Sequence, residues 1–297
     1  MSRHQKSPKV AVVVPVGPGI QTALDTLDSV EAFCEGSHVV YVVDDCTTDG
    51  TYEAILDARK PHWHVLRNKC NQGIDRLTHT LCTGFKAVLH ETDCDLVLRL
   101  DQDALLIKPG LIADALHFME SHRDVGLFGV YRVDFNRPRS FESHRQLIKT
   151  ELSWPRRLAG MVPSWAPYFD AAMARNYRPG DNVFGGAYFV TRSCLLSMQA
   201  IGALDVPWDW HSRMQEDVYF SMVAVAAGFK LGHFAAPDGP LCMEWRGLPL
   251  PALELVASKY KLVHSVDKGK NTTPAENGGK SAREVFKLNR PFRSVPS

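Results

Sequence analysis

The 297-residue chain lacks any pair of cysteines at the C-x-x-C spacing, and its cysteine count is odd. The seven cysteines are scattered at Cys34, Cys46, Cys70, Cys82, Cys94, Cys194 and Cys242. Closely spaced pairs are typical of structural zinc sites, and even sets of cysteines are typical of disulfide frameworks. The scattered set instead indicates reduced thiols, most of them small core residues, in a cytoplasmic protein.

The chain also lacks an excess of charge of either sign. Its 34 Lys and Arg residues and 33 Asp and Glu residues give a formal net charge of +1. Binding of nucleic acid through overall basicity requires a larger positive excess, so we expect no nucleic-acid partner. Small anionic ligands are favoured instead.

No apolar run approaches the roughly 18 residues that a membrane-spanning helix needs. Residues 10–16 follow basic residues, as the apolar part of a signal peptide does, but this run is short, contains Pro15 and has no small-residue cleavage site. We expect a first β-strand here and no transmembrane segment. The sequence leaves peripheral contact with a membrane open.

Short apolar runs rich in β-branched residues alternate with helical patterns through the first half of the chain. Strands are expected at 10–16, 38–45, 63–68 and 95–101, and helices at 22–33, 51–59, 76–90 and 111–122. Continuous apolar strands separated by helices predict a parallel sheet that is covered on both faces. The predicted fold class is therefore α/β.

The pattern predicts four parts along the chain. Residues 1–8 form an N-terminal extension, 9–130 a nucleotide-binding type of half, and 131–267 a second half with an irregular insert at 134–181. Long inserts of this kind are usually lids or binding loops, and a surface excursion with one or two helices is the alternative. Residues 268–297 are polar and basic, which predicts a flexible tail, with a short docked helix at its end as a variant of this prediction.

Asp101 and Asp103 are the most informative side chains in the sequence, because they follow an apolar run one residue apart. Alternate residues of a strand point to the same side, so both carboxylates aim at one point where a divalent cation could be held. Asp44, Asp45 and Asn68 end other expected strands. Ligands gather at the carboxyl ends of strands in open α/β sheets, so these groups should meet in one crevice. A solvated strand end is the competing interpretation.

Four segments, in this order, resemble the family 2 nucleotide-sugar glycosyltransferases, which have the GT-A fold. They are VVVPV at 12–16, VVDDCTTDGT at 42–51, LRLDQDALLIKPG at 98–110 and QEDVYFSMVAVAAGFKL at 215–231. The resemblance implies a single domain with a mainly parallel, Rossmann-like sheet flanked by helices and an insert on the acceptor side. It implies a donor-binding half ending at the Asp-x-Asp motif and a catalytic, acceptor-binding half after it.

The resemblance also implies the reaction. A sugar would pass from a nucleotide-sugar, most simply a UDP-sugar, to a hydroxyl acceptor, with inversion and with the help of Mn²⁺ or Mg²⁺. Contacts to the nucleotide-sugar are expected from Pro15, Val16, Asp44, Asp45, Asn71, Gly73, Arg76, Asp101, Gln102, Gly185 and Gly186. Asp45 is favoured over Asp44 as the contact to the nucleobase of the donor. Leu77, Thr78 and His79 replace the family's usual Ala-Arg-Asn, so Arg76 is either a nucleotide contact or a helix-surface arginine.

Metal and catalytic residues follow from the same resemblance. Asp103 and Asp101 would bind the cation, with His264 as a third ligand and His233 as its rival. Hard cations prefer carboxylate and phosphate oxygens and stabilise negative charge on a diphosphate leaving group.

In the pair of acids that begins the fourth segment, Asp217 is expected to be the base and Glu216 to orient the acceptor. Complementing the helix dipole is the competing interpretation for Glu216. Trp208 and Trp210 are expected to form acceptor platforms, ahead of Trp165 and Tyr168.

Other classes fit the sequence less well. A sugar nucleotidyltransferase would carry Arg or Lys in the glycine-rich loop after the first strand, where this chain reads VGPGIQTALD. A dinucleotide-binding oxidoreductase would continue Gly17 and Gly19 into a complete G-x-G-x-x-G motif, which is interrupted here. A non-catalytic carbohydrate- or nucleotide-binding protein of the same fold and a retaining glycosyltransferase remain as alternatives.

Overall fold

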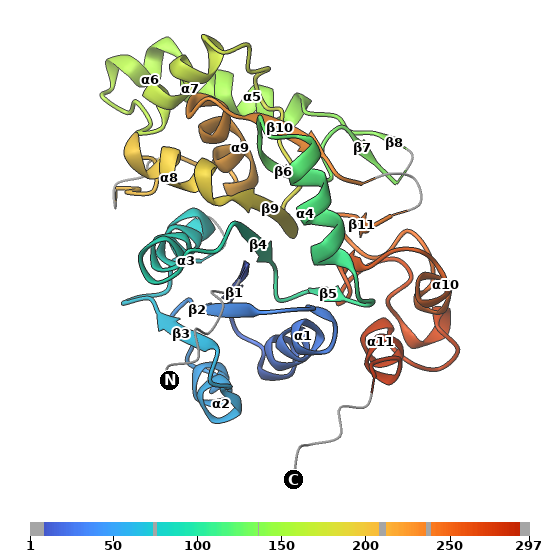
Figure 1. Cartoon of the computed structure of the whole chain (residues 1–297). Coiled ribbons are helices and arrows are strands. Elements are labelled where there is room, and N and C mark those ends of the chain that lie inside the picture. The colour runs from blue at the N-terminus through green and yellow to red at the C-terminus, as the bar shows by residue number, and fades with distance from the viewer. Residues whose placement is uncertain (1–8, 74–75, 136, 208–211, 236–238, 292–297) are drawn as a thin grey trace.

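A seven-stranded sheet forms the centre of the computed structural model, which describes residues 9–73, 76–135, 137–207, 212–235 and 239–291 (Figure 1). The strand order is β10-β6-β9-β4-β1-β2-β3. The strands are β1 (Val10–Val16), β2 (His38–Asp44), β3 (Trp63–Arg67), β4 (Leu96–Leu100), β6 (Val125–Gly129), β9 (Ala187–Thr191) and β10 (Lys230–His233). Only β9 runs antiparallel to its neighbours, so the prediction of a mainly parallel sheet is confirmed.

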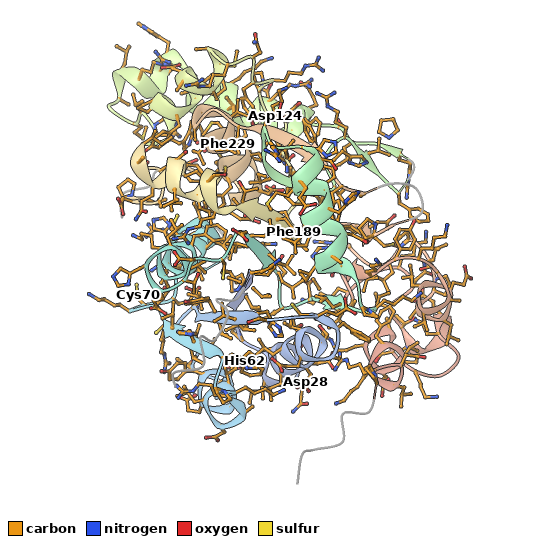
Figure 2. The ribbon with its side chains drawn as sticks, in the orientation of Figure 1. Asp28, His62, Cys70, Asp124, Phe189 and Phe229 are labelled. Atoms are coloured by element: carbon orange, nitrogen blue, oxygen red, sulfur yellow. The ribbon has the colours of Figure 1, made fainter. Side chains whose placement is uncertain are left out.

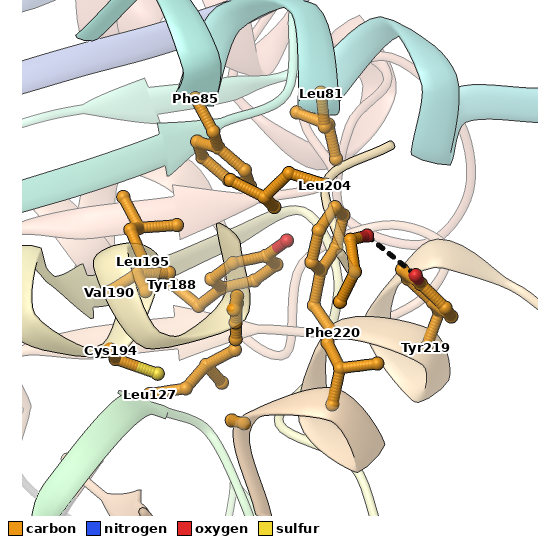
Figure 3. Packing of buried hydrophobic residues seen from close by; sticks show 14 of the residues in the cluster. Leu81, Phe85, Leu127, Tyr188, Val190, Cys194, Leu195, Leu204, Tyr219 and Phe220 are labelled. Atoms are coloured by element: carbon orange, nitrogen blue, oxygen red, sulfur yellow. Dashed lines mark hydrogen bonds between the residues drawn. The ribbon is translucent and has the colours of Figure 1, made fainter. Parts of the chain in front are cut away.

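Helices cover both faces of this sheet because alternate residues of the buried strands enter two separate cores. Ala11 and Val13 of β1 belong to one core, while Val12 and Val14 belong to the other. The first core contains residues of α3 (Leu77–Glu91), α8 (Arg192–Ala200) and α9 (Glu216–Ala226), and the second contains residues of α1 (Ile20–Phe33), α2 (Thr51–Ala58) and α4 (Leu111–Ser121). Figure 3 shows part of the first core, where the rings of Phe85 and Phe220 meet edge to face at 5.2 Å.

A three-stranded sheet connects the end of the chain to the Asp-x-Asp segment. Its order is β11 (Leu241–Met243), β12 (Leu262–His264) and β5 (Ala104–Leu106). The antiparallel register of β12 with β5 sets His264 opposite Ala104. This pairing brings His264 next to Asp103, far from it in sequence.

The C-terminal segment, for which we expected a flexible tail with a short docked helix as a variant, is packed on the domain as far as it is described. It contains a 3₁₀-helix, η2 (Pro274–Glu276), and helix α11 (Ala282–Leu288), which contacts α10 (Ala252–Ala257). Ser281 and Glu284 form a capping box at the start of α11, and Ala282, Val285 and Phe286 are buried. Helix α11 corresponds to the short docked helix that the prediction allowed as a variant, and its buried apolar stripe explains why it docks.

The insert at 134–181 is more regular than expected. A short hairpin of β7 (Val133–Asp134) and β8 (Arg137–Pro138) is followed by α5 (Glu142–Glu151), α6 (Trp154–Leu158) and α7 (Ala166–Met173). Helix α7 packs on α9. Trp165 anchors the start of α7, because its ring is fully buried and its Nε1 donates to the Ser212 hydroxyl at 2.8 Å.

Within the ranges described, none of the helices combines the length and the apolar character that crossing a bilayer requires.

Candidate active site

Asp101, Asp103 and His264 converge where β4 ends. The Nε2 atom of His264 lies 3.2 Å from Asp103 Oδ1 and 3.9 Å from Asp101 Oδ2. One ligand atom from each of the three residues lies within 4.8 Å of the others. Two carboxylate oxygens and one imidazole nitrogen fit a hard or borderline cation such as Mn²⁺ or Mg²⁺.

Neighbouring groups hold two of these ligands in place. The Nδ1–H of His264 donates to the Glu244 carbonyl at 2.9 Å, which turns Nε2 toward the carboxylates. The Ser265 hydroxyl donates to Asp103 Oδ2 at 2.6 Å. Burial opposes ionisation of Asp103, but His264 and Ser265 outweigh it and hold the pKa of Asp103 well below its usual value.

The pKa of Asp101 is shifted in the direction opposite to that of Asp103. The Asp101 backbone N–H donates to the Gly186 carbonyl at 2.7 Å. Burial raises the pKa of Asp101, and the charge of Asp103 adds to this effect against the opposing charges of Arg99 and His264. A cation bound at this point would add positive charge and would favour the ionised form of Asp101.

Gly186 provides the space that His264 occupies. Its φ of +85° lies in the left-handed region, and a Cβ atom there would come within 2.8 Å of the His264 ring. Gly185 lies against the two acids of the fourth segment, since a Cβ there would meet Glu216 Oε1 at 3.0 Å. Both glycines of the pair therefore border the site.

We expect Gly186→Ala to weaken Mn²⁺ binding and to destabilise the fold by roughly 1–3 kcal/mol, because it combines left-handed strain with displacement of His264. Gly279→Ala is the matched control, since Gly279 has a φ of +91° but open space around its Cβ position. Calorimetric Mn²⁺ titrations and urea unfolding of both variants would measure the two effects. Equal Mn²⁺ affinity in the two variants would contradict the role given to Gly186.

Arg99 joins the two acidic motifs, and the sequence analysis missed it. The side chain is fully buried, with Nη2 at 2.7 Å from Asp101 Oδ1 and 3.0 Å from Glu216 Oε1. Its guanidinium carbon lies 5.4 Å from the centre of the Tyr188 ring. A charged residue inside the apolar run LVLRL was the available signal, because a strand buried on both faces carries an arginine only when the arginine has acidic partners.

Removing this charge should be costly. Arg99→Met leaves Asp101 and Glu216 buried without their shared counter-charge, so we expect a loss of about 3–5 kcal/mol in the free energy of unfolding. Arg99→Lys keeps the charge and should lose less. Urea unfolding would compare the two, and equal losses would show that packing of the guanidinium, rather than its charge, matters here.

Asp217 and Glu216 begin α9 but have different surroundings. Asp217 Oδ2 accepts hydrogen bonds from Asn182 Nδ2 at 2.5 Å and from the Gly185 backbone N–H at 3.0 Å. These donors hold the carboxylate in one orientation. Burial raises the pKa of Glu216, and the charges of Asp217 and Asp101 act in the same direction against Arg99.

The acids at the end of β2 organise the loops around them. Asp44 is fully buried and accepts a hydrogen bond from the Thr47 hydroxyl at 2.6 Å. Asp45 accepts hydrogen bonds from the backbone N–H groups of Gln72 and Gly73, at 2.9 and 2.8 Å to its nearer oxygens, and retains 9% exposure. The side chain of Asn71 donates to the Asp45 carbonyl at 2.9 Å. The candidates Asp45, Asn71 and Gly73 thus form one loop cluster.

Gln102 ties the Asp-x-Asp segment to the end of β1. Its Oε1 accepts from the Gly17 N–H at 2.7 Å, and its Nε2 donates to the Pro18 carbonyl at 3.1 Å. Pro15 and Val16 are buried in β1 directly before this loop. Arg76 is placed immediately before α3.

A second residue that the sequence analysis missed comes from the predicted tail. The Arg283 guanidinium donates to the Gln102 carbonyl at 3.2 Å, to Asp25 at 2.7 Å and to Asp267 at 2.8 Å. Helix α11 therefore holds the backbone of the Asp-x-Asp segment through this arginine. No local pattern around Arg283 signals this contact.

The remaining candidate residues do not join this site in the part of the chain that the structure describes. His233 accepts a hydrogen bond from the Tyr131 N–H at its Nδ1, so the structure brings His264 and not His233 to the acidic pair. Trp165 is a buried anchor rather than an exposed platform. Trp208 and Trp210 lie outside the described residues.

Another group of possible metal ligands, Glu31, His38 and His62, is explained by hydrogen bonding. Figure 2 shows His62 near α1 and α2. Glu31 Oε1 lies 2.8 Å from Trp63 Nε1 and 2.7 Å from His62 Nε2, and Lys60 lies 3.1 Å from Oε2. The buried carboxylate is thereby satisfied without a metal ion.

Comparison with solved structures agrees with this architecture. The chain is similar to a mannosyltransferase, PcManGT from Pyrobaculum calidifontis, solved in complex with GDP-Man and Mn²⁺, with a TM-score of 0.51 and 17% identity. The match covers 90% of this chain and 60% of that one, so the chain spans only part of the length of this neighbour. TarS from S. aureus matches 76% of this chain and 35% of its own at 17% identity, with a TM-score of 0.48.

The central sheet, the small sheet beside it and the acidic site at their junction define the GT-A fold. No curated protein matches the chain. The sequence model of glycosyl transferase family 2 matches residues 11–193, which is more than half of the chain. The chain belongs to glycosyl transferase family 2.

Proposed function

We propose that the protein transfers a sugar from a nucleotide-sugar to a hydroxyl group of an acceptor. The observation that carries this proposal is the convergence of Asp101, Asp103 and His264 beside the acids that begin α9, with Arg99 joining the two groups. Membership in glycosyl transferase family 2 supports the same reaction. The acceptor and its binding residues, Trp208 and Trp210 among them, remain part of the proposal.

We infer that a divalent cation, Mn²⁺ or Mg²⁺, binds at Asp101, Asp103 and His264. A cation at this point would neutralise charge on the diphosphate leaving group. Mn²⁺ suits the mixed oxygen and nitrogen set better than Mg²⁺. The Mn²⁺ in the PcManGT complex supports this inference.

For the chemical step we propose a single displacement with inversion. Asp217 removes the proton of the acceptor hydroxyl while the oxygen forms a bond to the anomeric carbon. The bond from that carbon to the diphosphate oxygen breaks, and its electron pair leaves with the nucleoside diphosphate. Glu216 orients the acceptor, and its raised pKa makes it the rival for the role of base.

Donor recognition is proposed at the carboxyl ends of β1, β2 and β4. Asp45 is the proposed contact to the nucleobase because its side chain keeps some exposure, whereas Asp44 keeps none. The other contacts are proposed at Pro15, Val16, Asn71, Gly73, Arg76, Gln102, Gly185 and Gly186. A cytoplasmic location is part of the proposal, supported by seven free cysteines.

A screen of nucleotide-sugars should identify the donor. We propose a UDP-sugar, and the GDP-Man in the PcManGT complex makes GDP-sugars the main comparison. With Mn²⁺ present, the cognate donor at about 100 times its dissociation constant should add about 2.7 kcal/mol to the free energy of unfolding, because it binds only the folded state. Thermal shift with UDP-, GDP-, dTDP- and CMP-sugars would measure this, with EDTA removing the shift. Failure of all four classes would contradict the proposed function.

A further inference from the structure

The turn that contains α6 exposes an unusual density of large apolar side chains. Trp154 is 71% exposed, Leu158 67%, Met161 44% and Val162 46%. All four fall within nine consecutive residues, which we call the α6 turn (residues 154–162). None of the residues of α6 is buried. Exposed apolar side chains clustered in this way mark an interaction surface, whereas single ones are ordinary.

The charge of this segment has one sign. Between Leu152 and Phe169 the sequence contains two arginines, Arg156 and Arg157, and no Asp or Glu. Arg157 is exposed, and its Nε donates to the Leu152 carbonyl at 3.1 Å, which holds the base of the side chain against the turn. Tryptophan and arginine together are typical of the boundary between lipid headgroups and acyl chains, since each has an apolar body and a polar end.

The position of the α6 turn in the molecule suits contact with a flat surface. Helices α5, α6 and α7 lie together at one end of the molecule, at the top of Figure 1, while α2 lies at the other. The turn joins α5 to α7 rather than a strand of the central sheet.

We propose that the α6 turn docks the protein on an anionic lipid bilayer. Its apolar side chains would enter the headgroup region, and the exposed Arg157 would pair with lipid phosphates. A protein partner fits less well, because a stable protein interface needs about 800 Å² on each side, more than four side chains on one short turn present. The inference is independent of the proposed transfer reaction, and its test involves no nucleotide-sugar.

Sedimentation of the full chain with vesicles tests the proposal. The protein should bind phosphatidylcholine vesicles that contain phosphatidylglycerol, and bind pure phosphatidylcholine vesicles more weakly. Trp154→Ser with Leu158→Ser should lower the partition coefficient at least ~10-fold, because two large apolar side chains no longer enter the bilayer. Arg157→Gln should reduce the dependence on phosphatidylglycerol while leaving part of the binding to neutral vesicles.

The chain offers a matched control. Trp245 and Leu288 are 72% and 65% exposed, nearly the same as Trp154 and Leu158, but lie outside the α6 turn. Trp245→Ser with Leu288→Ser should leave the partition coefficient unchanged, and thermal unfolding should show that both double variants are folded. No vesicle binding by the wild type, or equal losses in the two double variants, would overturn the proposal. Loss of self-association in light scattering, with vesicle binding unchanged, would assign the turn to a second copy instead.

Discussion

Replacement of Asp103 by Ala is expected to abolish Mn²⁺-dependent binding of the donor. Asp103 is the carboxylate that lies nearest His264, and Ser265 and His264 hold it ionised. Without it, the proposed cation would keep only Asp101 and His264 as ligands from the protein, and the diphosphate would lose the charge that anchors it. We expect donor affinity in Mn²⁺ to fall to the level measured for the wild type in EDTA. Isothermal calorimetry with and without EDTA would measure both values.

Asp93→Ala is the control for this experiment. Asp93 lies shortly before β4 with a side chain that is 85% exposed, and its ion pair with Arg192 is long, at 3.3 Å. Its loss changes the net charge by the same amount as Asp103→Ala but should leave donor affinity unchanged. If Asp103→Ala keeps the Mn²⁺-dependent part of the affinity, the cation does not bind where we place it.

The local patterns of the sequence were sufficient to predict the helices and four of the strands of the donor half, but not β5 and β6. The expected strand at 95–101 is β4 and the expected helix at 76–90 is α3, each displaced by one residue at the ends. Both cases depend on continuous apolar runs or on regular helical spacing, which are properties of neighbours in sequence. The fold class followed from the order of these elements.

The parts that could not be predicted depend on contacts between distant segments. Arg283 contacts the carbonyl of Gln102 across 181 positions, and nothing in the residues around it indicates this partner. The sequence could not show which of His264 and His233 lies near Asp103 for the same reason, because the pairing of β12 with β5 determines this position. Arg99 is different, since a buried arginine in an apolar strand was visible in the sequence and only its partners were not.

Asp217→Asn should produce the largest loss of turnover with the smallest change in structure. The amide keeps the shape of the carboxylate but cannot accept the acceptor proton, so we expect kcat to fall by roughly 10²–10⁴-fold. Donor affinity should be unchanged, because Asp217 is held by Asn182 and Gly185 rather than by the proposed cation ligands. Slow hydrolysis of the cognate nucleotide-sugar, with water as the acceptor, would serve as the assay.

Glu216→Gln decides between the two acids. Glu216 contacts Arg99, so its replacement should perturb the charge balance around Asp101. The loss of kcat in Glu216→Gln should be at least ~10-fold smaller than the loss in Asp217→Asn. Asp205→Asn, at an exposed acid that pairs with Lys86, should have no effect. The reverse order of losses would make Glu216 the base, in agreement with its raised pKa. The anomeric configuration of the released sugar, observed by NMR before it equilibrates, tests the mechanism separately: a single displacement by water must invert it, and retention would require a second nucleophile that neither acid, as placed here, provides.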